Sequence, residues 1–221
     1  MEMQAGRWRV RLGQEAGAAL ALRARLFRAG GTDRDAFDAG ALHLTVEGPD
    51  GPAACARLTV QDGPAALRGY TAQSYDLTRF AAAFARLVEV GRIGFAPGPL
   101  DPDVPRLLLA AMARLVVAEQ AAVLYGCASF PADGTGMARL RGRAAPEGWR
   151  PGPKAPETVA LPDRPGPLPP LLRSWLALGA GVSDHAVRDR DLGTMHVFTA
   201  LPVAAIPPAR AAALTGLLDA A

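Results

Sequence analysis

Residues 87–95 read Leu-Val-Glu-Val-Gly-Arg-Ile-Gly-Phe, and residues 103–121 read Asp-Val-Pro-Arg-Leu-Leu-Leu-Ala-Ala-Met-Ala-Arg-Leu-Val-Val-Ala-Glu-Gln-Ala. The first stretch is short and mostly apolar, which predicts a strand. The second predicts a helix, because Leu108, Met112 and other apolar side chains recur on one side. Residues 122–127 are apolar and predict a buried strand. This strand–helix–strand order indicates a crossover connection.

The segments on either side of this crossover predict further strands and helices. Residues 42–46 and 54–60 predict a hairpin, because residues 48–52 between them, Gly-Pro-Asp-Gly-Pro, are turn formers. The remaining predicted elements are strands at 8–12, 158–161, 182–187 and 194–200, and helices at 14–27, 76–84, 171–178 and from Pro207 onward. Antiparallel strands followed by a crossover predict an α/β fold with a central, mixed, mostly antiparallel sheet flanked by helices.

The composition predicts one folded domain over residues 1–221. Half of the residues are apolar, which excludes general disorder. Residues 131–170 are rich in proline, glycine and arginine, so we expect a partly ordered excursion, either a flap over a site or a surface loop. The net charge is +3, and every basic residue except Lys154 is an arginine. This mild charge, without a dense basic stripe, argues against nucleic-acid binding.

The cysteines and apolar stretches bear on the compartment. Cys55 and Cys127 cannot build a disulfide framework, and no metal-binding spacing accompanies them. The longest apolar stretch, residues 107–130, is interrupted by charged residues, so we expect no membrane span. From the cysteines and this stretch together, we expect a cytoplasmic protein without a bound metal. The excursion also holds a run of arginines, either a solvated surface or a docking site for an acidic protein or anionic headgroups: Arg139, Arg141, Arg143 and Arg150.

Two charged residues interrupt the apolar strand predicted at 87–95. Burying Glu89 or Arg92 costs several kcal/mol unless each is paired. They face opposite sides of an ideal strand, but Gly91 between them permits a bulge that changes this. A bulge also frees a backbone N–H that could stabilise an oxyanion. The pair therefore indicates either a catalytic site or a structural ion pair with Arg57.

An acidic loop precedes the predicted hairpin. Asp33, Asp35 and Asp38 could bind a cation or the ammonium group of a substrate, or they could cap a helix and a solvated turn. Arg57 stands in the middle of a predicted strand, where an arginine usually answers a carboxylate. Its available partners are Asp35, Asp38 and Glu89.

Other sequence signals for chemistry are weak. Ser183-Asp184-His185 contains the residue types of a hydrolase triad, but neighbouring residues of a strand alternate sides and cannot bond in the triad order. The sequence contains no Gly-x-x-x-x-Gly-Lys-Ser/Thr or Gly-x-Gly-x-x-Gly motif, so nucleotide binding has no support.

Several short motifs over residues 20–200 carry a resemblance to a known family. The Glu-x-Gly-Arg strand at 89–92 and the Tyr-Gly-Cys-Ala-Ser-Phe-Pro element at 125–131 are the most specific in combination. The others are Leu22-x-x-Arg25-x-x-Arg28 with Phe27, Asp33-x-Asp35-x-Phe37-Asp38, His43-Leu44, Arg57-Leu58 and Tyr75-Asp76-Leu77. Together they resemble the bacterial ornithine-lipid N-acyltransferases, which are similar in turn to the acyl-homoserine-lactone synthases.

This resemblance implies a GNAT-like fold and transfer of a 3-hydroxyacyl chain from acyl carrier protein to the α-amine of ornithine, giving a lyso-aminolipid. It implies no cofactor, since the phosphopantetheine thioester of the carrier protein is the co-substrate. Because the product is a lipid, peripheral contact with the inner membrane is also expected. Residues 96–102 agree, since three prolines and Asp101 stand where acetyl-CoA-using relatives hold the pyrophosphate.

The resemblance also assigns roles to residues. Glu89 accepts a proton from the substrate ammonium, and Arg92 holds the substrate carboxylate or is itself locked by the aspartates. A backbone N–H near Gly91 stabilises the oxyanion. The remaining expected site residues are Asp35, Asp38, Arg57, Arg25 and Phe27 for the amino-acid substrate, and Gly91, Ser129 and Phe130 for the acyl chain and pantetheine.

Three alternatives stay open on the sequence. Glutamine could replace ornithine as the acceptor. The chain could be a non-catalytic module that binds an acyl chain or a carrier protein. It could also be an acetyl-CoA-dependent acetyltransferase, against which the proline-broken loop at 96–102 argues.

Overall fold

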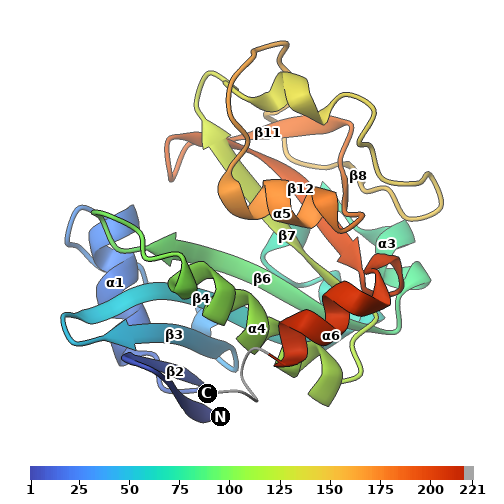
Figure 1. Cartoon of the computed structure of the whole chain (residues 1–221). Coiled ribbons are helices and arrows are strands. Elements are labelled where there is room, and N and C mark those ends of the chain that lie inside the picture. The colour runs from blue at the N-terminus through green and yellow to red at the C-terminus, as the bar shows by residue number, and fades with distance from the viewer. Residues whose placement is uncertain (217–221) are drawn as a thin grey trace. The chain divides into compact units, whose positions relative to one another are not determined.

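The structure, a computed structural model, describes residues 1–216 apart from the side chains of Leu214 and Thr215 (Figure 1). The chain divides into two compact units. Unit 1 holds residues 1–60, 90–120 and those from 207 on, and unit 2 holds residues 61–89 and 121–206. Strand β6 (Arg86–Phe95) contributes residues to both. The single domain expected over residues 1–221 stays a prediction, and residues 217–221 lie outside the described part.

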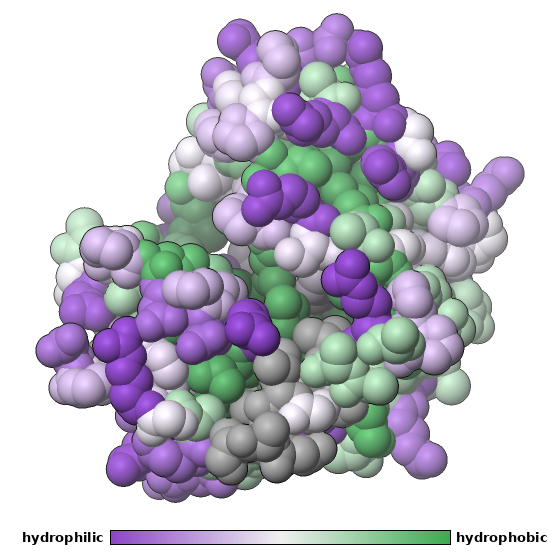
Figure 2. All heavy atoms as spheres, in the orientation of Figure 1, coloured by the Kyte–Doolittle hydropathy of each residue, from purple (hydrophilic) through white to green (hydrophobic). Residues whose placement is uncertain are grey.

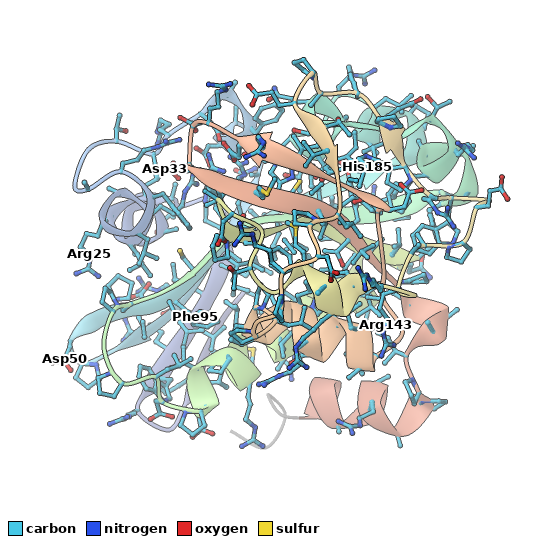
Figure 3. All side chains as sticks on the ribbon, turned by 90° about the horizontal axis from the view of Figure 1, so that it is seen from above. Arg25, Asp33, Asp50, Phe95, Arg143 and His185 are labelled. Carbon is cyan, nitrogen blue, oxygen red and sulfur yellow. The ribbon has the colours of Figure 1, made fainter. Side chains whose placement is uncertain are left out.

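Unit 1 is a set of antiparallel strands covered by helices. The strands are hydrogen-bonded in the order β1-β2-β3-β4-β6, where β1 is Glu2–Ala5, β2 is Trp8–Gly13, β3 is Leu42–Gly48 and β4 is Gly51–Asp62. The helical elements are α1 (Gly17–Phe27), the 3-10 turn η1 (Ala36–Asp38), α4 (Asp103–Ala118) and α6 (Pro208–Gly216). Figure 3 shows α1 and α4 on opposite sides of these strands.

Residue pairing across the β3–β4 hairpin sets one face of unit 1. His43 is opposite Arg57 and Thr45 is opposite Cys55, so these side chains share the face that α1 covers. The predicted hairpin is confirmed, with longer strands and a tight turn at Pro49-Asp50. Strand β1 was not predicted, because it is only four residues long. Its half-buried Met3 and Ala5 alternate with exposed Glu2 and Gln4.

Unit 2 contains the second set of strands. Their order is β6-β7-β12-β11-β9, with β10 paired to β12, where β7 is Val123–Pro131, β9 is Thr158–Ala160, β10 is Gly181–Val182, β11 is His185–Asp189 and β12 is Thr194–Pro202. A separate pair joins β5 (Tyr75–Asp76) to β8 (Gly152–Pro153). The helical elements are α2 (Gly63–Ala66), η2 (Thr71–Gln73), α3 (Thr78–Ala83), η3 (Met137–Leu140), α5 (Pro170–Ala177) and η4 (Val203–Ala205).

An aromatic core holds residues 61–84 against the strands of unit 2. Tyr75, Phe80, Tyr125 and Phe198 are fully buried, and the Phe80 ring centroid lies 4.9 Å from that of Tyr125 and 5.1 Å from that of Phe198. Aromatic rings of this size bury large areas, so this core contributes much of the packing energy. It also places η2 beside the first half of β6.

The structure corrects three predicted boundaries. The helix expected at 76–84 begins at Thr78, because Asp76 belongs to β5 and its Oδ1 accepts the backbone N–H of Thr78 at 2.9 Å in the turn before the helix. The strand expected at 182–187 is divided into β10 and β11, since Ser183 turns its hydroxyl to the carbonyl of His185 at 2.6 Å. Helix α4 ends before Gln120, whose φ is +51°. The expected mostly antiparallel α/β architecture is confirmed.

No helix of residues 1–216 has both the length and the apolar content that a membrane crossing requires. The excursion at 131–170 contributes η3, β8 and β9 to unit 2.

Candidate active site

Asp33 is the common acceptor of Arg23, Arg28 and Arg92 in unit 1. Its Oδ2 accepts from Arg23 Nε at 2.8 Å and from Arg92 Nε at 2.9 Å, and its Oδ1 accepts from Arg28 Nε at 3.0 Å. The side chains of Asp33 and Arg23 are fully buried. Because an unpaired buried charge is costly, these bonds tie α1, the acidic loop and β6 into one arrangement.

Asp38 and Asp35 extend these ion pairs to β4. We call the whole set the ionic cluster; its members are Arg23, Arg28, Asp33, Asp35, Asp38, Arg57 and Arg92. Asp38 Oδ1 accepts from Arg23 Nη1 at 2.6 Å and from Arg57 Nη1 at 3.3 Å, and Arg57 Nη1 also donates to Asp35 Oδ1 at 2.5 Å. Burial acts to raise the pKa of Asp38. The hydrogen bonds from Arg23 and the backbone of Asp35, and the charges of Arg23 and Arg57, outweigh burial and lower that pKa to about 2. The loop therefore supplies the carboxylate partners expected for Arg57.

The same carboxylates shape the loop itself. Asp35 Oδ1 accepts the backbone N–H of Phe37 at 2.9 Å, and Asp38 Oδ2 accepts that of Asp35 at 2.9 Å, which makes a capping box around η1. Capping and ion pairing are thus combined. Since guanidinium and amide donors occupy these oxygens, the arrangement does not favour a cation site.

Solvent reaches the ionic cluster unevenly. Asp35 keeps 27% of its side chain exposed and Arg28 keeps 23%, whereas Arg57 and Arg92 keep 3% and 6%. Asp35 and Arg28 therefore form the accessible rim, and a substrate that binds here meets them first.

The backbone of β6 is irregular at Arg92, where φ is +51°, a left-handed value that is unusual for a residue with a side chain. The irregularity follows directly after Gly91, close to the position where a bulge was expected. Cys55 Sγ donates to the carbonyl oxygen of Arg92 at 3.6 Å, and the ring of Phe27 lies 5.9 Å from the Arg92 guanidinium carbon. A Cβ at Gly91 would lie 3.9 Å from Arg57 Nη2. Phe27 therefore lies close to Arg92 of the ionic cluster, and Gly91 lies close to Arg57.

In unit 2, Glu89 is held by backbone amides of the turn that leads into η2. It is 6% exposed. Its Oε1 accepts the N–H of Thr71 at 2.6 Å, and its Oε2 accepts the N–H of Tyr70 at 3.2 Å. A Cβ at Gly69 would lie only 2.7 Å from Glu89 Oε2, so the chain passes this close to the carboxylate only because Gly69 has no side chain. Each oxygen of this buried carboxylate thus has a backbone N–H partner.

Two further polar contacts surround this carboxylate in unit 2. Tyr125 Oη donates to Gln61 Oε1 at 2.6 Å, and burial, followed by the charges of Glu89 and Cys127, raises the pKa of Tyr125 well above its usual range. The half-buried thiol of Cys127 lies 3.9 Å from Thr71 Oγ1. The resulting group of polar side chains on β6, β7 and η2 could receive an amine or a thioester.

The two residues of β7 that were expected to contact the acyl chain lie on opposite sides of the strand. Ser129 is exposed and stands opposite His196. Phe130 is 2% exposed, and its ring is 3.4 Å from a Cβ built on Gly136 in the excursion. Since neighbours in a strand alternate sides, one molecule on one face of β7 contacts Ser129 or Phe130 directly, but not both.

The structure also shows which arginine of α1 joins the ionic cluster. Arg25 is exposed, and Figure 3 shows it pointing away from the helix into solvent. Arg23, which sequence reasoning missed, is fully buried and bonds Asp33 and Asp38. The helical period contained the signal, because Arg23 shares the buried face with Ala19 and Leu22. The expected roles of Arg25 and the other site residues stay predictions.

The triad residue types at 183–185 do not assemble a nucleophile. Ser183 Oγ donates to the backbone carbonyl of His185, and His185 Nδ1 is 2.8 Å from Asp184 Oδ1. No serine–histidine side-chain bond is formed. The bond between Asp184 and His185 is nevertheless one that the argument from strand alternation did not allow, because Asp184 lies between β10 and β11 and not within a strand.

The arginines of the excursion are largely engaged. Arg141 pairs with Asp163 at 2.7 Å, Arg139 Nε donates to the carbonyl of Gly166 at 2.7 Å, and Arg150 pairs with Asp184 at 3.3 Å. Figure 2 shows this part, at the top of the view, as predominantly hydrophilic. These pairs favour the solvated-surface alternative.

Two acids lie at the N-terminus of α4. Asp101 Oδ1 accepts the backbone N–H of Asp103 at 2.9 Å, and Asp103 lies in the first turn. A helix N-terminus binds phosphate through free N–H groups and positive potential. Two carboxylates at this end work against pyrophosphate.

Comparison with a protein-family model and with curated relatives supports the fold. Residues 19–98, less than half of the chain, match the family described as acetyltransferase (GNAT) domain, and the expected GNAT-like fold is confirmed. Over 146 residues the chain is 33% identical to the L-ornithine N(alpha)-acyltransferase of Rhodobacter capsulatus, covering 59% of this chain and 56% of that protein. The chain thus spans about half the length of the curated relatives it matches.

Solved structures agree on the fold. The acyl-homoserine-lactone synthase LasI superposes with a TM-score of 0.54 at 14% identity, covering 95% of each chain. FeeM, an N-acyl amino acid synthase from uncultured soil microbes, superposes with a TM-score of 0.53 at 12% identity, covering 88% of this chain and 95% of that one. At these identities the similarity shows the fold alone.

Proposed function

We propose that the protein is an N-acyltransferase that moves a 3-hydroxyacyl chain from acyl carrier protein to the α-amine of ornithine, giving a lyso-aminolipid. The amine nitrogen attacks the thioester carbon, the carbon–sulfur bond breaks, and the carrier thiol leaves with a proton. The GNAT-like fold and the 33% identity to a protein named L-ornithine N(alpha)-acyltransferase support this reaction.

The observation that carries the proposal is the buried carboxylate of Glu89. The ammonium group of the acceptor must lose a proton before the amine attacks, and a carboxylate that is shielded from water can accept it. Amide donors at both oxygens hold Glu89 in one orientation, so its lone pairs have a fixed direction. In this proposal Glu89 takes the proton, and an N–H near Gly91 stabilises the oxyanion.

The ionic cluster of unit 1 is proposed as the acceptor-binding side. Its rim presents a carboxylate at Asp35 and a guanidinium at Arg28, the two charges that complement the ammonium and carboxylate of an amino acid. Arg92 and Arg57 are held behind this rim by Asp35 and Asp38. The cluster therefore supports an amino-acid acceptor over an uncharged amine.

A carrier-protein thioester is the donor in this proposal, because the two acids at the start of α4 disfavour the pyrophosphate of acetyl-CoA. The phosphopantetheine arm brings no nucleotide to this end. Contact with the inner membrane is proposed only because the product is a lipid.

The test measures thiol release from 3-hydroxyacyl carrier protein with a panel of amino acids. Release that depends on ornithine supports the proposal, and release that depends on glutamine corrects the acceptor. Glu89→Gln should lower turnover by at least about a hundredfold, whereas Glu15→Gln, an exposed control, should not. Normal turnover in Glu89→Gln would remove its assigned role. Folded protein that releases no thiol with any amino acid would favour a non-catalytic binding module.

A further inference from the structure

Lys154 is the single lysine among the 24 basic residues of the chain. It lies in the excursion, next to β8, and its Nζ donates to the carbonyl oxygen of Ala72 at 2.6 Å. An ammonium is a compact charge that can satisfy one carbonyl, whereas the planar guanidinium is suited to carboxylates. In a sequence that otherwise uses arginine, this position carries the side chain that fits a lone carbonyl.

The carbonyl that Lys154 binds belongs to η2, the turn whose entry holds Glu89. The N–H groups of Tyr70 and Thr71 donate to Glu89, and the carbonyl of Ala72 accepts from Lys154. Peptide dipoles favour an anion at the N–H end of a turn and a cation at its carbonyl end. No side chain caps η2 from within the turn. The two charges therefore clamp it from opposite ends.

Backbone pairing continues this clamp along the chain. The N–H of Ala155 donates to the carbonyl of Ser74 at 3.1 Å, and Tyr75 pairs with Pro153 in the β5–β8 ladder. Residues 152–155 thus run beside residues 72–76. Because these two segments are hydrogen-bonded, we expect a shift of residues 152–155 to move η2 as well, and with it the Tyr70 and Thr71 amides that bind Glu89.

We infer that Lys154 is a positioning residue for Glu89, acting through the carbonyl of Ala72 and the amides of Tyr70 and Thr71. It touches neither substrate nor reacting atoms in this role. The inference rests on the proposed function only for its kinetic consequence, because the coupling of Lys154 to the amides on Glu89 is a property of the folded protein.

The experiment compares Lys154→Met, Lys154→Arg and Arg139→Met in the full chain. Arg139 is the matched control, because it also lies in the excursion and also donates to a backbone carbonyl, that of Gly166, but away from η2. Hydrogen exchange of the Tyr70 and Thr71 amides reports the clamp. Thiol release from 3-hydroxyacyl carrier protein reports kcat and KM.

We expect Lys154→Met to speed exchange of both amides and to lower kcat about tenfold, since small misplacements of catalytic groups are costly. Lys154→Arg should recover only part of both losses, because it keeps the charge but its guanidinium fits a lone carbonyl less well. Arg139→Met should match the unmodified chain.

Unchanged exchange in a folded Lys154→Met, or faster exchange with normal kcat, would overturn the inference. If Lys154→Met does not fold, an intermediate loss in Lys154→Arg, with faster exchange of the same two amides, supports it, and unchanged exchange overturns it. A protein that transfers no acyl group refutes the proposed function, while the exchange rates still decide whether Lys154 clamps the turn.

Discussion

Arg23→Met should cost about 3–5 kcal/mol of unfolding free energy, the usual loss when one partner of a buried ion pair is removed. Arg23 Nε donates to Asp33 at 2.8 Å, and its Nη1 and Nη2 donate to Asp38 at 2.6 and 3.2 Å. Methionine fills the space but leaves both carboxylates with fewer donors. Urea unfolding at pH 7 measures the loss. Arg25→Met, on the exposed side of the same helix, is the control and should change stability by less than about 0.5 kcal/mol.

The pH dependence gives this prediction a second readout. In the folded protein the pKa of Asp38 is lowered from 3.8 to about 2, so its stabilising effect is complete above pH 4 and is lost as the pH falls toward 2. At 1.36 kcal/mol per pKa unit, that loss is about 2 kcal/mol. In Arg23→Met this acid-dependent loss should shrink or reverse, because burial then acts against fewer donors. An Arg23→Met protein as stable as Arg25→Met, or one that keeps the full acid-dependent loss, would refute the reasoning.

Three further outcomes follow from single contacts. Gly69→Ala places a Cβ 2.7 Å from Glu89 Oε2 and should lower turnover at least about tenfold. Gly148→Ala is the control, because its Cβ meets nothing within 4 Å, and it should not lower turnover. Equal rates in the two variants would contradict the close approach. Burial raises the pKa of the Cys55 thiol to about 12, so a disulfide reagent at pH 8 should label Cys127 and spare Cys55 in the folded protein, and mass spectrometry that finds Cys55 labelled first would count against this. Burial lowers the pKa of His196, so as the pH falls the unfolded chain takes up a proton there first, and stability should fall below about pH 6.5. His196→Gln should reduce this fall, measured as unfolding midpoints between pH 7.5 and 5.5. An unchanged fall would contradict the prediction.

Most of the fold was predictable because its signals are local. The strand at 87–95, the helix from 103 and the hairpin at 42–60 each show their period or turn residues within a short window. Strand β1 was missed because the alternation of Met3 and Ala5 with Glu2 and Gln4 is too short to be distinctive, and only pairing with β2 makes it a strand. Tertiary pairing of this kind leaves little trace in four residues.

The candidate site was predictable only in part, for a related reason. Glu89 and Arg57 stood out because charged residues in apolar strands need partners. The partners of Glu89 are the backbone N–H groups of Tyr70 and Thr71. Every residue except proline has such a group, so no residue type in the sequence identifies these partners. Arg23 was missed because a helical period is usually counted over apolar residues, although it occupies a buried position of that period.

The sharing of carboxylates within the ionic cluster has an evolutionary consequence. Asp33 serves Arg23, Arg28 and Arg92 at once, and Asp38 serves Arg23 and Arg57. Losing a buried member such as Arg23 leaves Asp33 and Asp38 with fewer donors away from water, so the effects of substitutions within the cluster should not be additive. We therefore expect the residues of the ionic cluster to change together during evolution, so that related sequences keep most of them or have lost most of them.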